Sequence, residues 1–329
     1  MPTNLPPEAI EAERRFRAAR TTADKIATLE EFLSLIPKHK GTDKLRADLR
    51  KKLAKLKSDT EVRKKGAVRQ SSVFRIDREG AGQAAVIGPT NVGKSALVAA
   101  LTNAAPEVAG APFTTWKPTP GMMPVENIQI QLVDTPPLDR EFVEPELLDL
   151  IRRADLILLV VDLQTDPLQQ LEDAVTLLEE HHIAPSQRQD RYTEEQHMTF
   201  RPLLVLVNKN DDERTDEDFE ICCALLDEEW SLHPISATSG RNLERLKRLV
   251  YEQLEIIRVY SKPPGKEPDY ETPFILPKGS TVDELAAKVH RDFYEGLKTA
   301  RVWGSGVYDG QLVGRDHVLQ DGDIVELRI

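Results

Sequence analysis

Eight consecutive residues have the types and spacing that bind phosphate groups. Gly88 to Ser95 read GPTNVGKS: a glycine, four variable residues, a second glycine, a lysine and a serine. The apolar run AAVIG leads into this loop and the run KSALVAALTNA leaves it, so we expect a strand, the loop and a helix. Backbone N–H groups would surround the phosphates, Lys94 would reach the β- and γ-phosphates, and Ser95 would bind Mg²⁺. The loop predicts a nucleotide without indicating the base.

Two later motifs indicate that the base is guanine. The sequence NKND, Asn208 to Asp211, follows an apolar run, and the Asp211 carboxylate can accept hydrogen bonds from guanine N1 and N2, which adenine does not offer. Asn208 is expected to tie this segment to the phosphate-binding loop, while the stem of Lys209 lies along the base. In the SAT tripeptide farther on, the Ala237 N–H would face guanine O6. Since a lone NKxD is a weak match, the prediction depends on finding these motifs together and in this order.

The residues between the phosphate-binding loop and NKND include two candidate metal ligands. Asp134, in DTPP, follows the run IQIQLV and stands where a carboxylate holds Mg²⁺ in P-loop proteins. Thr115, in FTTWKPTPG, can offer hydroxyl and carbonyl oxygens to Mg²⁺ and the γ-phosphate. An isolated Thr-Thr pair is more often part of a turn or a strand, so this assignment depends on order and spacing.

Alternating strands and helices must position these motifs. The runs IQIQLVD, LILLVVD and LLVLVN predict buried strands, and helical patterns lie near 167–181, 216–228 and 241–256. This alternation is typical of an α/β fold with a mostly parallel sheet and helices on both faces. The polar stretch 181–200 is expected to be a surface loop, and KPPGKEPDYETP a linker. The short strands and one helix that follow predict a small β-grasp-like domain.

A basic segment precedes the phosphate-binding loop. Residues 38–69 hold 13 Lys and Arg against 4 Asp and Glu, whereas the whole chain has a net charge of −11. Leucines recur at helical spacing from Leu45 to Leu56, and we expect a helical hairpin over residues 8–65. An acidic protein is a poor general binder of nucleic acid, but such a segment can contact RNA locally. The alternative is an ordinary solvated helix face.

The composition is that of a water-soluble protein of the cytoplasm. No apolar run approaches the roughly 18 residues that span a bilayer, and the N-terminus lacks the apolar stretch of a signal peptide, so no membrane partner is expected. The two cysteines, Cys222 and Cys223, are adjacent in a predicted helix. Vicinal disulfides are rare, so we interpret both as reduced thiols, consistent with the cytoplasm.

The five motifs in this order, with FTT and PG in the second, resemble those of Obg-type GTPases. From RVYSKPPGKEPDYETP to the closing GDIVELRI, the chain resembles the TGS domain of the developmentally regulated GTP-binding (DRG) family, and KLRADLRKKLAKLK is similar to that family's N-terminal helical region. The resemblance covers nearly the whole chain. It implies a P-loop fold, GTP hydrolysis with Mg²⁺, and a ribosome or RNA contact through the basic helix and the TGS domain. A purely structural TGS domain is the alternative.

The resemblance implies an N-terminal helical region over 1–70, a GTPase (G) domain over 80–260, a linker over 261–272 and a TGS domain over 273–329. The residues expected around the nucleotide are Gly88, Pro89, Thr90, Asn91, Val92, Gly93, Lys94, Ser95, Phe113, Thr114, Thr115, Trp116, Lys117, Asp134, Thr135, Pro136, Pro137, Asn208, Lys209, Asn210, Asp211, Ser236, Ala237 and Thr238. The metal ligands among them are Ser95, Thr115 and Asp134, and those expected to act in catalysis are Lys94, Thr115 and Asn91.

The chain departs from the DRG pattern in three places. Pro137 stands where the third motif ends in a glycine whose N–H binds the γ-phosphate, and proline has no N–H. A short loop around 183–200 stands where DRG proteins carry a folded insertion. Asn91 replaces the usual serine and resembles the asparagine that coordinates K⁺ in potassium-using GTPases, so K⁺ is a second candidate ion. In addition, Leu138 follows the third motif, where a Ras-like protein has a water-positioning glutamine.

These features predict a slow GTPase that acts as a switch. The segments around Thr115 and Asp134 would respond to the γ-phosphate and change the contacts with partners. The alternative is a scaffold that binds GTP or GDP and hardly hydrolyses it, which Pro137 and Leu138 favour. An ATP-using enzyme is disfavoured by NKND and SAT.

Overall fold

The computed structural model describes residues 74–102, 117–140, 142–226 and 230–328, with isolated positions before residue 50. The chain divides into two units, residues 1–73 and residues 74–329. The predicted helical hairpin and basic helix of the first unit lie outside the described residues, as do residues 113–116 of the second motif.

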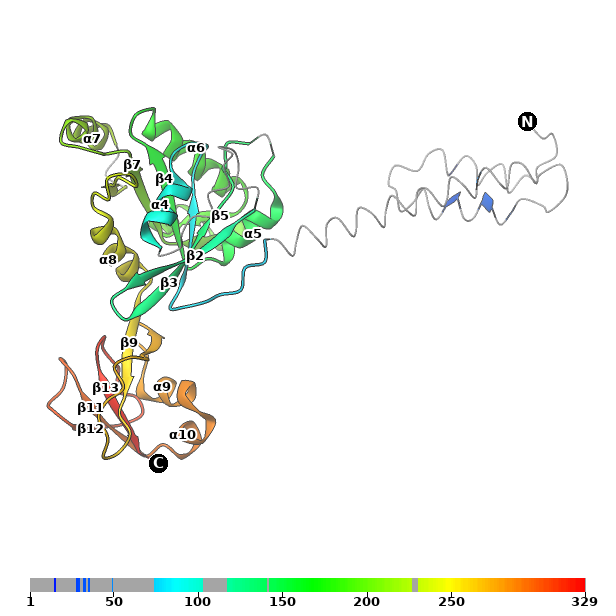
Figure 1. Ribbon diagram of the computed structural model, residues 1–329. Coiled ribbons are helices and arrows are strands. Elements are labelled where there is room, and N and C mark those ends of the chain that lie inside the picture. Colours follow the sequence, from blue (N-terminus) through cyan, green and yellow to red (C-terminus); the bar gives the residue numbers. More distant parts are fainter. Residues whose placement is uncertain are drawn as a thin grey trace, which may run out of the picture. The chain divides into compact units, whose positions relative to one another are not determined.

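A six-stranded sheet forms the G domain, with strand order β2–β3–β1–β4–β7–β8. Figure 1 labels β2, β3, β4 and β7 of this sheet. The strands are β1 (Gln83–Ile87), β2 (Thr119–Val125), β3 (Ile128–Asp134), β4 (Leu156–Asp162), β7 (Leu203–Asn208) and β8 (Leu232–Pro234). β2 pairs antiparallel with β3, and the other neighbours are parallel. The predicted mostly parallel α/β sheet is therefore confirmed, with one antiparallel strand at its edge.

Five helices accompany this sheet in the described residues: α4 (Lys94–Leu101), α5 (Pro145–Arg153), α6 (Pro167–Glu180), α7 (Arg214–Leu225) and α8 (Leu243–Gln253). α4 and α8 share one apolar cluster with alternate residues of β1 and β4, such as Val86 and Leu158. The intervening residues of these strands are also fully buried, which explains why LILLVVD is apolar throughout. No helix in the described part of the chain is both long and apolar enough to cross a membrane.

The stretch 181–200 is folded, so the prediction of a surface loop was wrong. β5 (Ile183–Pro185) and β6 (Thr199–Arg201) pair as a small parallel sheet, joined by the 3₁₀ helices η1 (Ser186–Arg191) and η2 (Glu194–Gln196). β5 is buried along its whole length. The three buried residues of β5 are too few to change the polar composition of the segment, and that composition suggested a loop.

A second sheet, of five strands, forms the C-terminal domain, in the order β10–β9–β13–β11–β12. Its strands are β9 (Ile256–Ser261), β10 (Phe274–Pro277), β11 (Thr299–Trp303), β12 (Gln311–Val313) and β13 (Ile324–Arg328). β9 and β13 are parallel, and each also pairs with an antiparallel neighbour. Two helices, α9 (Val282–Val289) and α10 (Arg291–Gly296), follow β10, where the sequence indicated one.

The boundary between the two domains lies earlier than the sequence suggested. Because β9 belongs to the second sheet, that domain begins at Ile256 rather than at residue 273. The predicted linker over 261–272 is the connection between β9 and β10, which pair antiparallel within one domain. Its proline and glycine residues are typical of a linker and equally of a long turn, and only the strand pairing separates the two.

Candidate nucleotide-binding site

The loop from Gly88 to Ser95 connects β1 to α4, as its sequence predicted. Gly88 and Gly93 have φ angles of 145° and 93°. A Cβ atom at Gly88 would lie 2.2 Å from the Val160 carbonyl oxygen, and one at Gly93 would lie 2.3 Å from Nδ2 of Asn208. Both positions therefore require glycine, because their φ angles are positive and a Cβ atom would collide with a neighbouring strand residue. The two glycines let the loop pass close to β4 and β7.

Lys94 is buried inside this loop, with a side chain that folds back over it. Its Nζ donates to the carbonyl oxygens of Gly88 at 3.0 Å and Pro89 at 2.6 Å. Burial lowers the pKa of Lys94 from 10.5 to about 8, and the carboxylates of Asp134 and Asp139 partly oppose that shift. A phosphate group beside the ammonium would favour its charged form and raise the pKa again.

Ser95 and Asp134, two of the three predicted Mg²⁺ ligands, contact each other. The Ser95 hydroxyl donates to Oδ2 of Asp134 at 2.6 Å. Asp134 ends β3, and its Cα pairs in register with Val86 of β1, next to the start of the loop. A hydroxyl and a carboxylate suit Mg²⁺, which takes oxygen ligands and is usually completed by phosphates and water. The described residues contain no group of three or more His, Cys, Asp or Glu that could hold a metal ion.

The second motif is largely outside the described residues. Phe113, Thr114, Thr115 and Trp116 are not described, so the predicted role of Thr115 as a ligand remains a prediction. Lys117 is exposed at the start of the described segment, two residues before β2.

The third motif is fastened to the phosphate-binding loop. The Leu138 N–H donates to the Gly88 carbonyl at 3.2 Å, and Oδ1 of Asp139 accepts from the N–H and the hydroxyl of Thr90, at 3.0 and 2.8 Å. Pro137 has no N–H to offer, and the next N–H along the chain is used by Gly88. Asp139 was not anticipated, because no motif singles out a carboxylate at this place.

Two residues of the third motif that were predicted to contact the nucleotide, Thr135 and Pro136, are buried in the protein. The Thr135 side chain is fully buried and donates to the Val86 carbonyl at 2.7 Å, so it joins β3 to β1 rather than facing a ligand. Pro136 is also buried. Both residues follow β3 directly, and their side chains are buried beside the sheet instead of facing the site.

Asn208 ties its own segment to the phosphate-binding loop, as expected, and it also contacts the SAT motif. Its Nδ2 donates to the Val92 carbonyl at 2.7 Å, and its Oδ1 accepts from the Ala237 N–H at 3.0 Å. The Ser236 hydroxyl donates to Oδ1 of Asp211. The Ala237 N–H that was expected to face guanine O6 is thus already bonded to Asn208, and any contact with the base would have to be shared. Thr238, the last residue of SAT, is exposed.

Lys209 has a partner that the sequence analysis missed. Its Nζ forms an ion pair with Oδ2 of Asp162, whose side chain is almost fully buried at the end of β4. Oδ1 of Asp162 accepts from the Gln164 N–H at 2.9 Å. A signal was present in the sequence, because LILLVVD ends in a carboxylate at the same edge of the parallel sheet as NKND.

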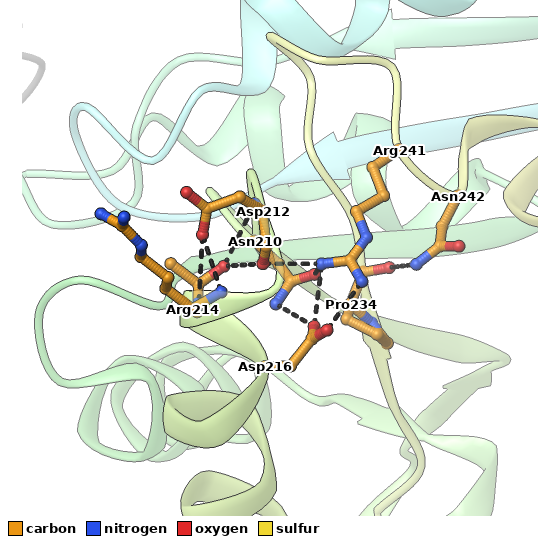
Figure 2. A network of polar contacts seen from close by, with 8 residues as sticks. Asn210, Asp212, Arg214, Asp216, Pro234, Arg241 and Asn242 are labelled. Carbon is orange, nitrogen blue, oxygen red and sulfur yellow. Dashed lines mark hydrogen bonds and ion pairs between the residues drawn. The ribbon is translucent and has the colours of Figure 1, made fainter.

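Asn210 does not face the site, contrary to its inclusion among the contact residues. Lys209 has a φ of 68°, a left-handed conformation, and the next side chain is fully buried. Asn210 donates to Oδ1 of Asp216 at 3.1 Å and accepts from Nη1 of Arg241 at 2.6 Å (Figure 2). Arg241 belongs to no recognised motif, and sequence reasoning gave no indication of this contact.

Comparisons with known proteins agree with this arrangement. A family described as 50S ribosome-binding GTPase matches residues 83–209, and the TGS domain matches residues 257–329. An uncharacterized GTP-binding protein of Methanocaldococcus jannaschii is 33% identical over 365 aligned positions, which cover 93% of this chain and 92% of that protein. Developmentally-regulated G-protein 3 of Arabidopsis thaliana is 28% identical, with coverage of 93% and 98%. The chain belongs to the DRG family of Obg-type GTPases.

Membership of the DRG family confirms the resemblance inferred from the motifs, and with it a GTP-binding P-loop domain followed by a TGS domain. The TGS match begins one residue after the start of β9, in agreement with the earlier domain boundary. Among solved structures, the YchF GTPase of Schizosaccharomyces pombe aligns with a TM-score of 0.53 at 14% identity and covers 77% of this chain and 99% of that chain. At this identity the likeness concerns the fold alone.

Proposed function

We propose that this DRG-family chain is a switch that binds GTP with Mg²⁺, hydrolyses it slowly and reports the γ-phosphate to a ribosomal or RNA partner. The observation that carries the proposal is the double hydrogen bond of Asn208, to Val92 of the phosphate-binding loop and to Ala237 of SAT. It joins a phosphate-binding loop to a guanine-reading segment, so that one nucleotide can occupy both.

Each part of the site has a distinct task in this proposal. The N–H groups at the start of α4 and the Lys94 ammonium would bind the β- and γ-phosphates, while Ser95 and Asp134 would hold Mg²⁺ directly or through water. Mg²⁺ supplies positive charge against the developing negative charge of the phosphoryl group. The Asp211 carboxylate, held by Ser236, would accept from guanine N1 and N2.

The third motif supports the proposal of slow turnover. Leu138 is buried and apolar, so the place of a water-positioning glutamine holds no polar side chain. Its N–H is bonded to Gly88, and Pro137 has none, so two backbone donors near the γ-phosphate are missing or engaged. The same observation favours the second candidate, a scaffold that binds GTP or GDP with little hydrolysis. Phosphate release over many turnovers separates the two, because a scaffold would not exceed one phosphate per protein.

A ribosome or RNA partner is the finer part of the proposal. It is supported by the basic residues 38–69, which oppose the net charge of the chain, and by the family description that matches residues 83–209. The basic segment would supply phosphate contacts of the kind that give salt-dependent affinity for RNA. The cytoplasm is the compartment that such a partner implies.

The guanine-reading role of Asp211 provides the main test. Asp211→Asn replaces a carboxylate that accepts two hydrogen bonds by an amide with one acceptor and one donor, so guanine N–H groups are poorly matched. We expect GDP affinity to fall by about 2–3 kcal/mol, roughly 30- to 150-fold. The neighbouring Asp212 is the matched control, because its Oδ1 accepts from Arg214 N–H at 2.9 Å at the start of α7. Asp212→Asn should change GDP affinity little. An effect of Asp211→Asn below about threefold would refute the assignment.

A further inference from the structure

The loop that carries Asp211 is fixed by the residues on either side of that carboxylate. Asn210 is fully buried, its N–H donates to the Ile235 carbonyl at 3.1 Å, and both polar atoms of its side chain are hydrogen-bonded. The carbonyl of Asp212, on the other side, accepts from Nη1 of Arg241 at 2.9 Å. Asp211 itself is exposed between these two anchored neighbours.

One guanidinium group reaches all of these anchors. Nη1 of Arg241 donates to Asn210, to the Asp212 carbonyl and to Oδ1 of Asp216 at 2.8 Å, and Nη2 donates to Oδ2 of Asp216 at 2.8 Å. Figure 2 shows the Arg241 side chain extending from its own loop toward the start of α7, with Asn210 and Asp216 converging on it. The guanidinium therefore joins NKND to the first turn of α7.

The contacts close into a circuit through the fifth motif. The Ser236 N–H donates to the Arg241 carbonyl at 3.1 Å, and the Ser236 hydroxyl donates to the Asp211 carboxylate. The Arg241 side chain thus holds the Asn210 side chain and the Asp212 carbonyl, one on each side of Asp211. The Arg241 backbone carbonyl holds Ser236, whose hydroxyl donates to the Asp211 carboxylate.

From this circuit we propose that Arg241 is the positioning residue for guanine recognition, acting on the base only through Asn210, Asp212 and Ser236. The inference rests on the proposed function, since it presumes that Asp211 reads guanine. A bidentate fork onto Asp216 with further donors to the loop needs the planar guanidinium, and an ammonium cannot reproduce that geometry. Loss of the fork would let Asp211 shift relative to the base.

The Arg241–Asp216 pair stays ionised over the usual range of assay pH. Hydrogen bonds from Arg241 and then from Asn210 hold the pKa of Asp216 below its ordinary value, and the bond to Asp216 raises the pKa of Arg241. The positioning effect should therefore not change between about pH 6 and 8. This separates it from any effect of Lys94.

The test compares GDP with IDP, whose hypoxanthine base lacks the exocyclic N2 amine of guanine. The ratio of the two dissociation constants reports how well a carboxylate meets N1 and N2 together. We expect Arg241→Lys to weaken GDP about tenfold, to weaken IDP less and to reduce the ratio by about fivefold, because the amine contact is lost first. GTP and GDP should weaken equally, since they share the base, and single-turnover cleavage at saturating GTP should stay within about twofold of wild type.

Two further variants keep the test decisive. Asp216→Asn preserves the shape of the partner, removes its charge and should lower the GDP/IDP preference in the same direction. Arg315→Lys is the matched control, because Arg315 also pairs with a carboxylate, that of Asp283 at 2.6 Å in the C-terminal domain, and its loss should leave the ratio unchanged. Thermal unfolding of each variant shows whether it is folded.

The outcomes distinguish this inference from the proposed function. A wild-type protein that binds GDP no more tightly than ADP contradicts the proposed function itself. A guanine-selective wild type whose GDP/IDP ratio is kept within about twofold in both folded variants overturns the positioning role of Arg241 alone. A reduced ratio with an unchanged Arg315→Lys control supports it.

Discussion

The Ser95 hydroxyl donates to Oδ2 of Asp134 at 2.6 Å, so the first turn of α4 and the carboxyl end of β3 meet at one point. The contact unites two residues that are 39 positions apart in sequence. Ser95 belongs to the phosphate-binding loop and Asp134 to the third motif. Their contact is what makes a shared Mg²⁺ site physically reasonable.

Ser95→Asn should therefore weaken GTP more than GDP. A metal ion held by Ser95 would offset negative charge on the γ-phosphate, which GDP lacks, so loss of this ligand should affect the triphosphate more. Dissociation constants of GDP and a non-hydrolysable GTP analogue, with Mg²⁺ and with a chelator, measure the difference. Ser95→Thr retains the hydroxyl and serves as the control. Equal weakening of both nucleotides, with Mg²⁺ dependence intact, would count against Ser95 as a ligand.

GDP affinity should decline as the pH rises past about 8. Burial lowers the pKa of Lys94 to about 8, so the free protein loses the ammonium charge that binds phosphate above that pH. Well above pH 8 each further pH unit would cost up to about tenfold in affinity. The measurement is GDP affinity between about pH 7 and 8.5, where most of the guanine N1 keeps its proton and the Lys94 ammonium is partly lost.

Lys94→Arg provides the comparison for this pH effect, because arginine stays charged throughout. It should bind GDP more weakly but with no decline in this window, whereas a decline of equal slope would assign the titration to another group. The stability effect has a definite sign as well. The folded pKa of Lys94 lies below the unfolded one, so between about pH 8 and 10.5 the unfolded chain binds more protons. The contribution of this group to the free energy of unfolding therefore rises with pH.

Much of the fold and the phosphate end of the site could be predicted from the sequence. Buried parallel strands are apolar along their length, and the polar residues that end them, such as Asp134 and Asn208, gather at one edge of the sheet. The phosphate-binding loop could be recognised locally, because its glycines, lysine and serine all lie within eight residues.

What could not be predicted depends on contacts between distant segments. Arg241 and Asn210 are 31 positions apart, and Asp139 and Thr90 are 49 apart; no pattern within either segment indicates its partner. Asn210 was assigned to the nucleotide because it stands inside NKND, but the left-handed Lys209 turns it into the protein. The assignment of 261–272 as a linker failed for a related reason, since strand pairing across that segment is a property of the fold.

Reversing Lys51, Lys52 and Lys55 to Glu should lower association with ribosomes or RNA. Each lysine that contacts a phosphate releases counterions on binding, so the variant should also have a flatter dependence of affinity on salt. These residues lie outside the described part of the chain, and the expectation depends on sequence alone. Nucleotide-dependent co-sedimentation at several salt concentrations measures the effect, with GDP affinity as the control that should not change. Unchanged co-sedimentation would favour the alternative, in which this segment is an ordinary solvated helix face.

K⁺ should stimulate GTP cleavage more than Na⁺, through Asn91. This residue is exposed in the phosphate-binding loop with a left-handed φ of 64°. Its side-chain carbonyl oxygen could bind a cation, whereas the loop backbone would offer N–H donors to the phosphates. A monovalent cation there would add positive charge against the charge that develops in the transition state, as an arginine finger does. Because Pro137 has no N–H to donate to the γ-phosphate, part of the negative charge of that phosphate would lack a hydrogen-bond donor. The cation would partly balance this charge.

Single-turnover cleavage of GTP in K⁺, Na⁺ and choline salts at equal ionic strength provides the comparison, for the wild type and for Asn91→Ser. We expect a K⁺ stimulation of about tenfold or more in the wild type, which corresponds to about 1.4 kcal/mol of transition-state stabilisation, and its loss in the variant. GDP affinity should differ little between the salts, because the extra charge acts mainly on the γ-phosphate. Equal rates of the wild type in all three salts would contradict a cation site. A K⁺ effect that survives Asn91→Ser would place the cation elsewhere and leave Asn91 as a loop residue chosen for its left-handed backbone.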